Sequence, residues 1–280
     1  MILKKPILLT ILLTAFALAG CGYDERSHFM SPQRQENGLV VILPGIEGES
    51  GFNHDIRKGL NAAGCFRAMP IYSWGAPIPL LGMFVNQMNV LGNKAAGKRI
   101  AKMIEEYQDR HPNSPVYVIG HSGGGGIAVF VAEHMSQGRQ IDGLILLSAS
   151  ISGNYDLTKA LDKCKNGIVN FYNRYDALLV GTAFLGNVDG GRYSSAGLSG
   201  FSEERNKLFQ IEITDEMTRQ TGGTAHSAAT RPGFVSRYVA PWVLSSQWPP
   251  DTSLMGPVPV IIQKKSAPAT DDSQPEEADE

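Results

Sequence analysis

The feature that most constrains the fold is a short apolar run that breaks at glycine and resumes as an apolar helix. The run, at residues 115–119, is rich in β-branched residues and predicts a buried strand. Gly120-x-Ser122-x-Gly124 follows it. A sharp turn from strand to helix brings the residues around the serine close together, so only small side chains fit there. Such a turn lifts the serine hydroxyl above a sheet edge, beside the free N–H groups of a helix N-terminus.

Two other interpretations of this stretch compete with a nucleophile. Glycine and serine are common in ordinary loops, and Gly123-x-Gly125-x-x-Ala128 also matches a dinucleotide-binding pattern. That pattern needs an acid near the end of the next strand, and the predicted strand at residues 143–150 ends without one. No Gly-Lys-Ser or Gly-Lys-Thr appears, which excludes a P-loop. Four successive glycines are each about 1 kcal/mol worse than alanine in a helix, so we expect the backbone to approach something closely.

Around this turn the sequence resembles the α/β-hydrolase family, which orders its catalytic triad as serine, then Asp or Glu, then histidine. Of the six histidines, only His226 follows both Ser122 and the candidate acids. The resemblance therefore implies Ser122 as nucleophile, His226 as base and Asp176, just past a predicted strand, as the triad acid. Asp189, on a loop of the same connection, remains the alternative acid. His121 adjoins the nucleophile, but neighbouring side chains of an extended chain point apart, so we expect it to line the pocket at most.

The resemblance also implies an oxyanion hole built from two backbone N–H groups. A glycine-rich loop at residues 44–51 follows the first predicted strand, and in α/β-hydrolases the matching loop supplies one donor. The family's usual His-Gly is Pro44-Gly45 here, so Ile46 takes the donor position and Glu47 is the alternative. The second donor falls at Gly123.

The fold class implied by the resemblance is α/β, with the α/β-hydrolase architecture. We expect a mostly parallel sheet of about six strands, helices on both faces, and little or no cap domain. Hydrophobic patterns predict strands at 38–43, 66–74, 115–119, 143–147, 167–173 and 207–213, and helices at 53–63, 94–110, 156–162 and 231–244. Two apolar stretches, 76–85 and 177–185, predict surface that contacts an acyl chain, with an ordinary packed helix as the alternative for the first.

The first twenty residues predict a targeting segment. Lys4 and Lys5 precede an apolar run at residues 6–18, which is shorter than the roughly 20 residues of a bilayer span. Residues 18–21 resemble a bacterial lipobox, which implies cleavage before Cys21 and acylation of its thiol; an ordinary secretory signal is the alternative. Gly22, rather than Asp, follows the cysteine, which favours the outer membrane.

The residue composition of the other segments predicts how the chain is divided. We expect a polar, lipid-anchored tether at residues 21–37, the hydrolase domain at 38–246, and a C-terminal extension at 247–280 with a disordered acidic tail. In the strand order that the α/β-hydrolase resemblance implies, Cys65 and Cys164 begin strands four steps apart, at about 4.8 Å per step. We therefore expect two free, buried thiols rather than a disulfide.

The predicted function is hydrolysis of carboxylic esters by a serine esterase or lipase tethered to the bacterial cell envelope, its membrane contact made through the acyl chains at Cys21. An acyltransferase, thioesterase or peptidase would use the same triad. A non-catalytic envelope lipoprotein that keeps the fold for binding is the competing class, and a vacant triad position would favour it. A net charge of −2 without a basic cluster argues against nucleic acid. The triad needs no cofactor, and no Cys/His cluster has metal-ligand spacing.

Overall fold

Within the residues that the structure describes, the central sheet has five parallel strands and one short antiparallel strand. The computed structural model describes residues 25–75, 87, 89–180, 186–255 and 261–262. In these residues the spatial order of the strands equals their order in the sequence. The strands are β1 (Leu39–Leu43), β2 (Val116–His121), β3 (Gly143–Leu147), β4 (Ile168–Tyr172), β5 (Leu208–Glu212) and β6 (Ile261–Ile262). Every residue of β1 to β4 is buried, as expected of parallel strands covered on both faces.

The chain reverses its direction of winding between β1 and β2. After β1 it crosses to the segment at residues 68–71, which bridges the free side of β1 at Ala68 and Ile71 instead of forming the full strand predicted at 66–74. It then returns to place β2 on the other side of β1. Ligands of open α/β sheets bind at the carboxyl ends of strands at such a switch point.

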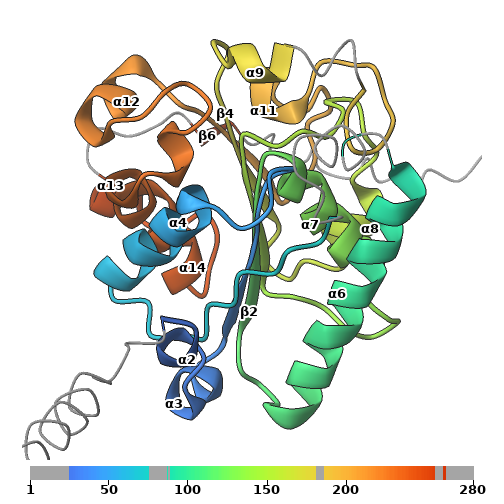
Figure 1. Ribbon diagram of the computed structural model, residues 1–280, viewed down its shortest axis with the longest axis vertical. Helices are drawn as coiled ribbons and strands as arrows, with labels where there is room; N and C mark the ends of the chain where they lie inside the picture. Colours follow the sequence, from blue (N-terminus) through green and yellow to red (C-terminus); the bar gives the residue numbers. More distant parts are fainter. Residues whose placement is uncertain (1–24, 76–86, 88, 181–185, 256–260, 263–280) are drawn as a thin grey trace, which may run out of the picture.

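Helices cover both faces of the sheet (Figure 1). On one face lie α4 (Gly51–Ala62), α13 (Pro232–Phe234) and α14 (Ala240–Leu244). On the other lie α6 (Val90–Arg110), α7 (Gly123–Glu133) and α8 (Thr158–Asp162). Each layer has its own hydrophobic core, because alternate strand residues such as Val40 and Val41 point to opposite sides.

The segment that we expected to belong to a polar tether contains two short helices packed on the domain. These are α2 (Glu25–Phe29) and α3 (Pro32–Glu36). Phe29 is 5% exposed and Arg34 is 3% exposed. The Arg34 guanidinium donates to the carbonyl oxygens of Cys65 and Arg67. Burial of one aromatic ring and one well-bonded arginine holds this polar segment against the body.

Other parts of the structure differ from the predictions in detail. Two helical segments that we did not predict are α12 (Asp215–Thr221), which follows β5, and the single turn α11 (Ala196–Ser199). The predicted closing helix is interrupted: α13 and α14 are joined by a π-helical turn, Val235–Val239. The short helix α9 (Ala177–Val180) covers the start of the second apolar stretch. The first stretch at 76–85 and residues 181–185 of the second lie outside the described residues.

Both remaining cysteines are free and buried, as predicted. In the described part of the chain, no helix has the length and hydrophobicity needed to span a bilayer.

Candidate active site

Ser122 occupies a tight elbow between β2 and α7. Its φ of 53° and ψ of −123° lie outside the regions that L residues normally adopt. Such a conformation costs on the order of 1–3 kcal/mol and persists only where the surroundings enforce it. Here the Ser122 N–H donates to the Leu147 carbonyl at 2.9 Å, and the Ser122 carbonyl accepts from Gly125 and Ser150 at 3.0 and 2.9 Å. The elbow is therefore held by β3 and the residues after it.

The glycines of the elbow are required by packing. A Cβ on Gly120 would lie closer than 3.0 Å to the backbone of Gly124, and one on Gly124 would meet the carbonyl oxygens of Leu43 and Pro44 equally closely. A Cβ on Gly125 or Gly126 would likewise lie closer than 3.0 Å to side-chain atoms of neighbouring loops. The glycine run was predicted to allow a close approach to the backbone, and the groups that approach it are other parts of this protein.

We expect Gly124→Ala to lower the free energy of unfolding by about 1–3 kcal/mol, because the new methyl group cannot fit without moving backbone atoms. Chemical denaturation measures the effect. Gly51→Ala is the matched control, since Gly51 also begins a helix and a Cβ there meets no atom within 4 Å. Equal stability of Gly124→Ala and Gly51→Ala would contradict the packing explanation.

The structure brings His226 and Asp176 together. The His226 Nδ1 lies 2.6 Å from the Asp176 Oδ2, and Asp176 is fully buried. The Leu179 N–H also donates to the other oxygen of this carboxylate, at 3.3 Å. Asp189, the alternative acid, accepts from the Ser152 N–H at 3.0 Å instead. The contact with His226 therefore favours Asp176.

His121 is a buried neighbour of His226 instead of a pocket-lining residue. It is 1% exposed, its ring centroid lies 5.0 Å from that of His226, and its Nε2 lies 3.4 Å from the His226 carbonyl oxygen. Because a carbonyl accepts, the Nε2 carries the proton, and within the described residues Nδ1 has no hydrogen-bond partner. Burial, with a further contribution from His226, lowers the pKa of His121 to about 3. A neutral His121 therefore supports the loop that carries His226.

The depressed pKa of His121 predicts a pH dependence of stability. Between about pH 6.5 and 3 the unfolded chain binds a proton at this residue that the folded chain does not, so stability falls as the pH falls. We expect His121→Asn to flatten the plot of unfolding free energy against pH over pH 4–6, by up to about 1.4 kcal/mol per pH unit. The half-buried His111, at the end of α6, offers the control His111→Asn. An unchanged slope in His121→Asn would contradict the assignment.

The Ser122 hydroxyl lies at the same rim, but within the described part of the chain it forms no hydrogen bond to His226. Ser122 is 9% exposed, so little of it reaches solvent. His121, its neighbour in sequence, carries the contact to the His226 loop. Catalytic hydrogen bonds are often long or poorly aligned without substrate and shorten in the complex.

The predicted oxyanion donors lie side by side. The Ile46 backbone nitrogen is 3.4 Å from the position that a Cβ on Gly123 would occupy. The loop carrying Ile46 is fixed by Trp74, whose indole N–H donates to the Pro44 carbonyl at 2.7 Å. We did not identify Trp74 from the sequence; its place at the end of the second predicted strand was the only available signal. The Ile46 nitrogen therefore lies close to Gly123, as the predicted donor pair requires.

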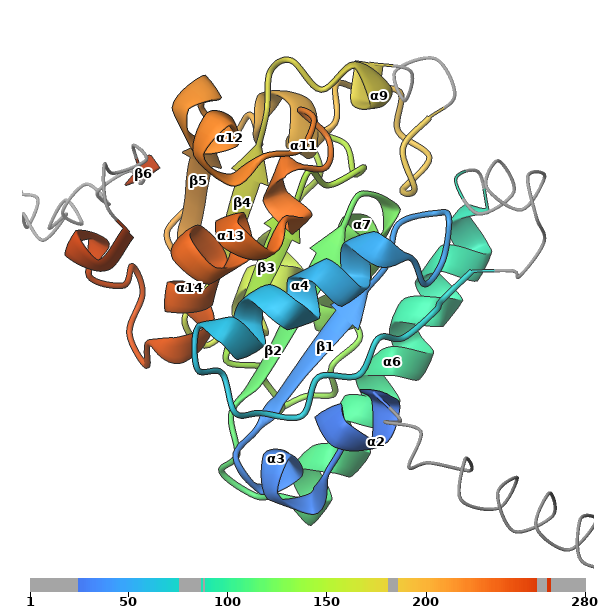
Figure 2. The same ribbon diagram turned by 60° about the vertical axis from the view of Figure 1, so that its left-hand side comes forward.

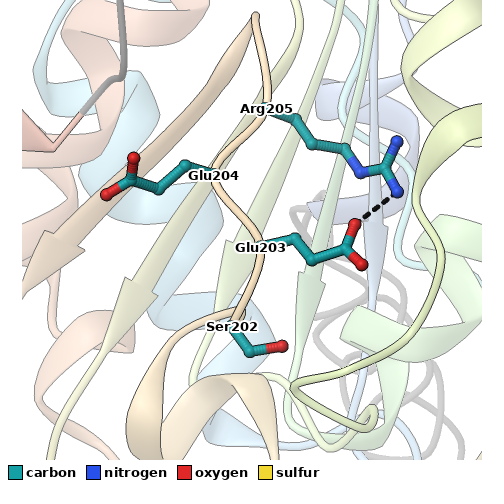
Figure 3. A pocket seen from close by; sticks show the side chains of 4 residues that line it. All are labelled: Ser202, Glu203, Glu204 and Arg205. Atoms are coloured by element: carbon teal, nitrogen blue, oxygen red, sulfur yellow. Dashed lines mark hydrogen bonds and ion pairs between the residues drawn. The ribbon is translucent and has the colours of Figure 1, made fainter.

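A surface pocket elsewhere on the molecule is separate from this site. Its lining side chains are Ser202, Glu203, Glu204 and Arg205 (Figure 3). Arg205 pairs with Glu203 and, at 3.3 Å, with Asp156. These residues precede β5 and so lie toward the sheet edge opposite Ser122. Among the described residues, no group of three or more His, Cys, Asp or Glu side chains could hold a metal ion.

Comparisons with known proteins agree with this arrangement. Residues 95–194, which include Ser122 and Asp176, match the family model described as serine aminopeptidase, S33. No curated protein gives a significant match.

Among solved structures, lipase B from Aspergillus fumigatus is 12% identical, with a TM-score of 0.48, over 76% of this chain and 54% of the lipase. The esterase domain of a Rhodothermus marinus protein is 13% identical, with a TM-score of 0.43, over 76% and 88% of the two chains. MenH from S. aureus is 11% identical, with a TM-score of 0.40, over 70% and 88%. This chain thus spans about half the length of the lipase. Similarity at this level carries no substrate over to this chain.

The family match covers the nucleophile elbow and the acid. The strand order, the helices on both faces of the sheet and the strained serine between β2 and α7 are the features expected of an α/β-hydrolase fold. The chain therefore has the α/β-hydrolase fold, and residues 95–194 match the serine aminopeptidase family model.

Proposed function

We propose that this protein is a serine hydrolase that cleaves carboxylic esters through Ser122, His226 and Asp176. The observation that carries the proposal is the 2.6 Å contact between the His226 Nδ1 and the buried Asp176, beside a serine on a strained elbow. Filled positions for nucleophile, base and acid support an enzyme over a non-catalytic lipoprotein with the same fold.

In the first step His226 acts as general base. Because its Nδ1–H donates to Asp176, its Nε2 is the free nitrogen that accepts the Ser122 proton as the hydroxyl oxygen attacks the ester carbonyl. Asp176 holds this tautomer and stabilises the imidazolium that forms. The N–H groups of Gly123 and Ile46 stabilise the oxyanion, and one such donor contributes about 3 kcal/mol.

In the second step His226 acts as general acid and then again as base. It returns the proton to the leaving alcohol as the tetrahedral intermediate collapses to an acyl-serine. A water molecule, deprotonated by His226, then attacks the acyl carbonyl, and His226 returns that proton to the Ser122 oxygen as the bond to the acyl group breaks and the acid leaves. No cofactor enters this cycle.

Exposed apolar side chains around the site favour a substrate with an apolar acyl group. Five of the seven exposed large hydrophobic residues in the described part of the chain are Leu91, Tyr175, Leu178, Val180 and Tyr193. They lie at the start of α6, around α9 and on the loop before α11, all toward the carboxyl-terminal edge of the sheet (Figure 2). Apolar surface beside a catalytic rim suits acyl chains, although it does not define their length.

We further propose that Cys21 is acylated and holds the protein in the bacterial cell envelope, at the outer membrane. Support comes from the lipobox-like residues 18–21 after a short apolar run. Mass spectrometry of the mature N-terminus tests this: a diacylated or triacylated Cys21 is expected, and an unmodified N-terminus would contradict it.

The experiment that tests the ester proposal is a screen of p-nitrophenyl esters of graded chain length on the protein lacking residues 1–21. We expect turnover that varies with acyl length. The family description as serine aminopeptidase makes peptide-bond cleavage the second candidate, so aminoacyl p-nitroanilides form the parallel arm. Turnover of the anilides alone would replace the ester assignment with a peptidase.

A further inference from the structure

The N-terminal helices α2 and α3 are bonded to one particular edge of the sheet. The Phe29 and Arg34 carbonyl oxygens accept from the N–H groups of Met69 and Ala68, each at 3.0 Å. The Ser114 hydroxyl, just before β2, donates to the Glu36 carbonyl at 3.0 Å. Since α3 leads directly into β1, these contacts place both helices at the amino-terminal edge of the parallel strands.

The candidate active site lies at the opposite edge. Ser122 follows the carboxyl end of β2, and Asp176 follows that of β4. Six residues of β2 at about 3.3 Å each separate the two edges by about 20 Å. Both views show α2 and α3 at one end of the molecule and α9 and α12 at the other (Figures 1 and 2).

The covalent distance from the proposed anchor to α2 is short. Only four residue steps separate Cys21 from Glu25, and a fully extended chain covers at most about 3.6 Å per residue, or about 14 Å. If the active-site rim rested on the bilayer, α2 would stand above it by at least the length of β2. That height exceeds the reach of the chain between Cys21 and α2.

We infer that the acylated protein stands with its amino-terminal sheet edge toward the bilayer, so that Ser122 faces away from the membrane that anchors it. The inference rests on the proposed acylation and ester hydrolysis. Its consequence is a substrate class: esters that arrive from the aqueous side, dissolved or on a facing surface, and not the lipids of the anchoring bilayer.

The orientation is tested without catalysis by energy transfer. Full-length, acylated Gln33→Cys and Leu178→Cys are labelled with a donor dye and placed in phosphatidylcholine vesicles that contain an acceptor lipid. Both positions are exposed, Gln33 on α3 and Leu178 on α9, and the unsubstituted chain with its buried Cys65 and Cys164 measures background labelling. We expect transfer several-fold stronger from position 33. Equal or stronger transfer from position 178, or a chain without acyl groups on Cys21, would overturn the inference.

The consequence for substrates is tested by lengthening the tether. Twenty Gly/Ser residues between Gly22 and Tyr23 add a coil of about 25 Å root-mean-square length. The assay uses a fluorogenic diacylglycerol ester, either in the vesicles that carry the protein or in protein-free vesicles, together with a soluble p-nitrophenyl ester. We expect the longer tether to raise at least tenfold the hydrolysis of the diacylglycerol ester in the vesicles to which the protein is anchored. Hydrolysis of that ester in protein-free vesicles, and of the soluble ester, should stay within twofold.

The same insertion after Thr270 is the matched control and should change none of the rates. The inference would be contradicted if the native and lengthened chains hydrolysed the diacylglycerol ester in their own vesicles equally fast, and as fast as the soluble ester. If no variant hydrolyses any ester, the proposed function fails, whereas the energy-transfer result still decides the orientation.

Discussion

Replacing Ser122 by alanine should lower kcat by about 10⁶-fold, the loss typical of removing the nucleophile of a serine triad. Without the hydroxyl no acyl-enzyme can form, and the oxyanion hole alone supports only residual turnover. The measurement is steady-state hydrolysis of the best ester from the chain-length screen, with circular dichroism to show that the variant is folded.

Ser148→Ala provides a demanding control for that result. Ser148 is fully buried at the end of the neighbouring strand β3, also has a positive φ of 47°, and its hydroxyl has no hydrogen-bond partner among the described residues. Removing a buried hydroxyl without partners is close to neutral, so kcat should stay within about threefold. A loss in Ser148→Ala comparable to that in Ser122→Ala would mean that the assay reports damage to the elbow and not chemistry.

The second large effect is expected at the acid. Asp176→Asn should lower kcat by about 10⁴-fold, because a neutral amide neither holds the His226 tautomer nor stabilises the imidazolium. Asp189→Asn is the matched control, because Asp189 accepts from the Ser152 backbone N–H, whereas Asp176 contacts His226. We expect its kcat within about threefold of wild type. The reverse order of the two losses would transfer the acid role to Asp189.

The meeting of the candidate site residues at one edge could be predicted because parallel strands end at a common edge. A glycine elbow after one strand, an acid after a later strand and a histidine after the last parallel strand all lie at that edge. The resemblance favoured Asp176 over Asp189 by its position just past a strand, but the sequence could not exclude Asp189, because both lie on one connection. It depends on a hydrogen bond that only the folded loops define.

The position of His121 depends on the fold in a different way. Alternation along an extended chain says only that its side chain diverges from that of Ser122. The positive φ of Ser122 turns the chain, and the His226 loop then closes over His121. No periodicity in the sequence encodes that contact.

The N-terminal helices were misjudged for a compositional reason. Residues 25–36 are mostly polar, and polar segments usually stay solvated. Arg34 is buried here because its guanidinium has carbonyl partners and lies over the Phe66 ring, 4.6 Å from the centroid. Those partners come from a loop more than 25 residues away, so local pattern could not reveal them. The helix α12 was identifiable: Thr214 caps it, and Asp215 and Glu216 lie in its first turn.

The most direct test of the proposed nucleophile is mass spectrometry after treatment with a fluorophosphonate probe, which reacts with activated serines. We expect one adduct, on the peptide containing Ser122, formed at least a hundredfold faster in wild type than in His226→Ala and absent from Ser122→Ala. An adduct on another residue, or equal labelling of wild type and Ser122→Ala, would contradict it.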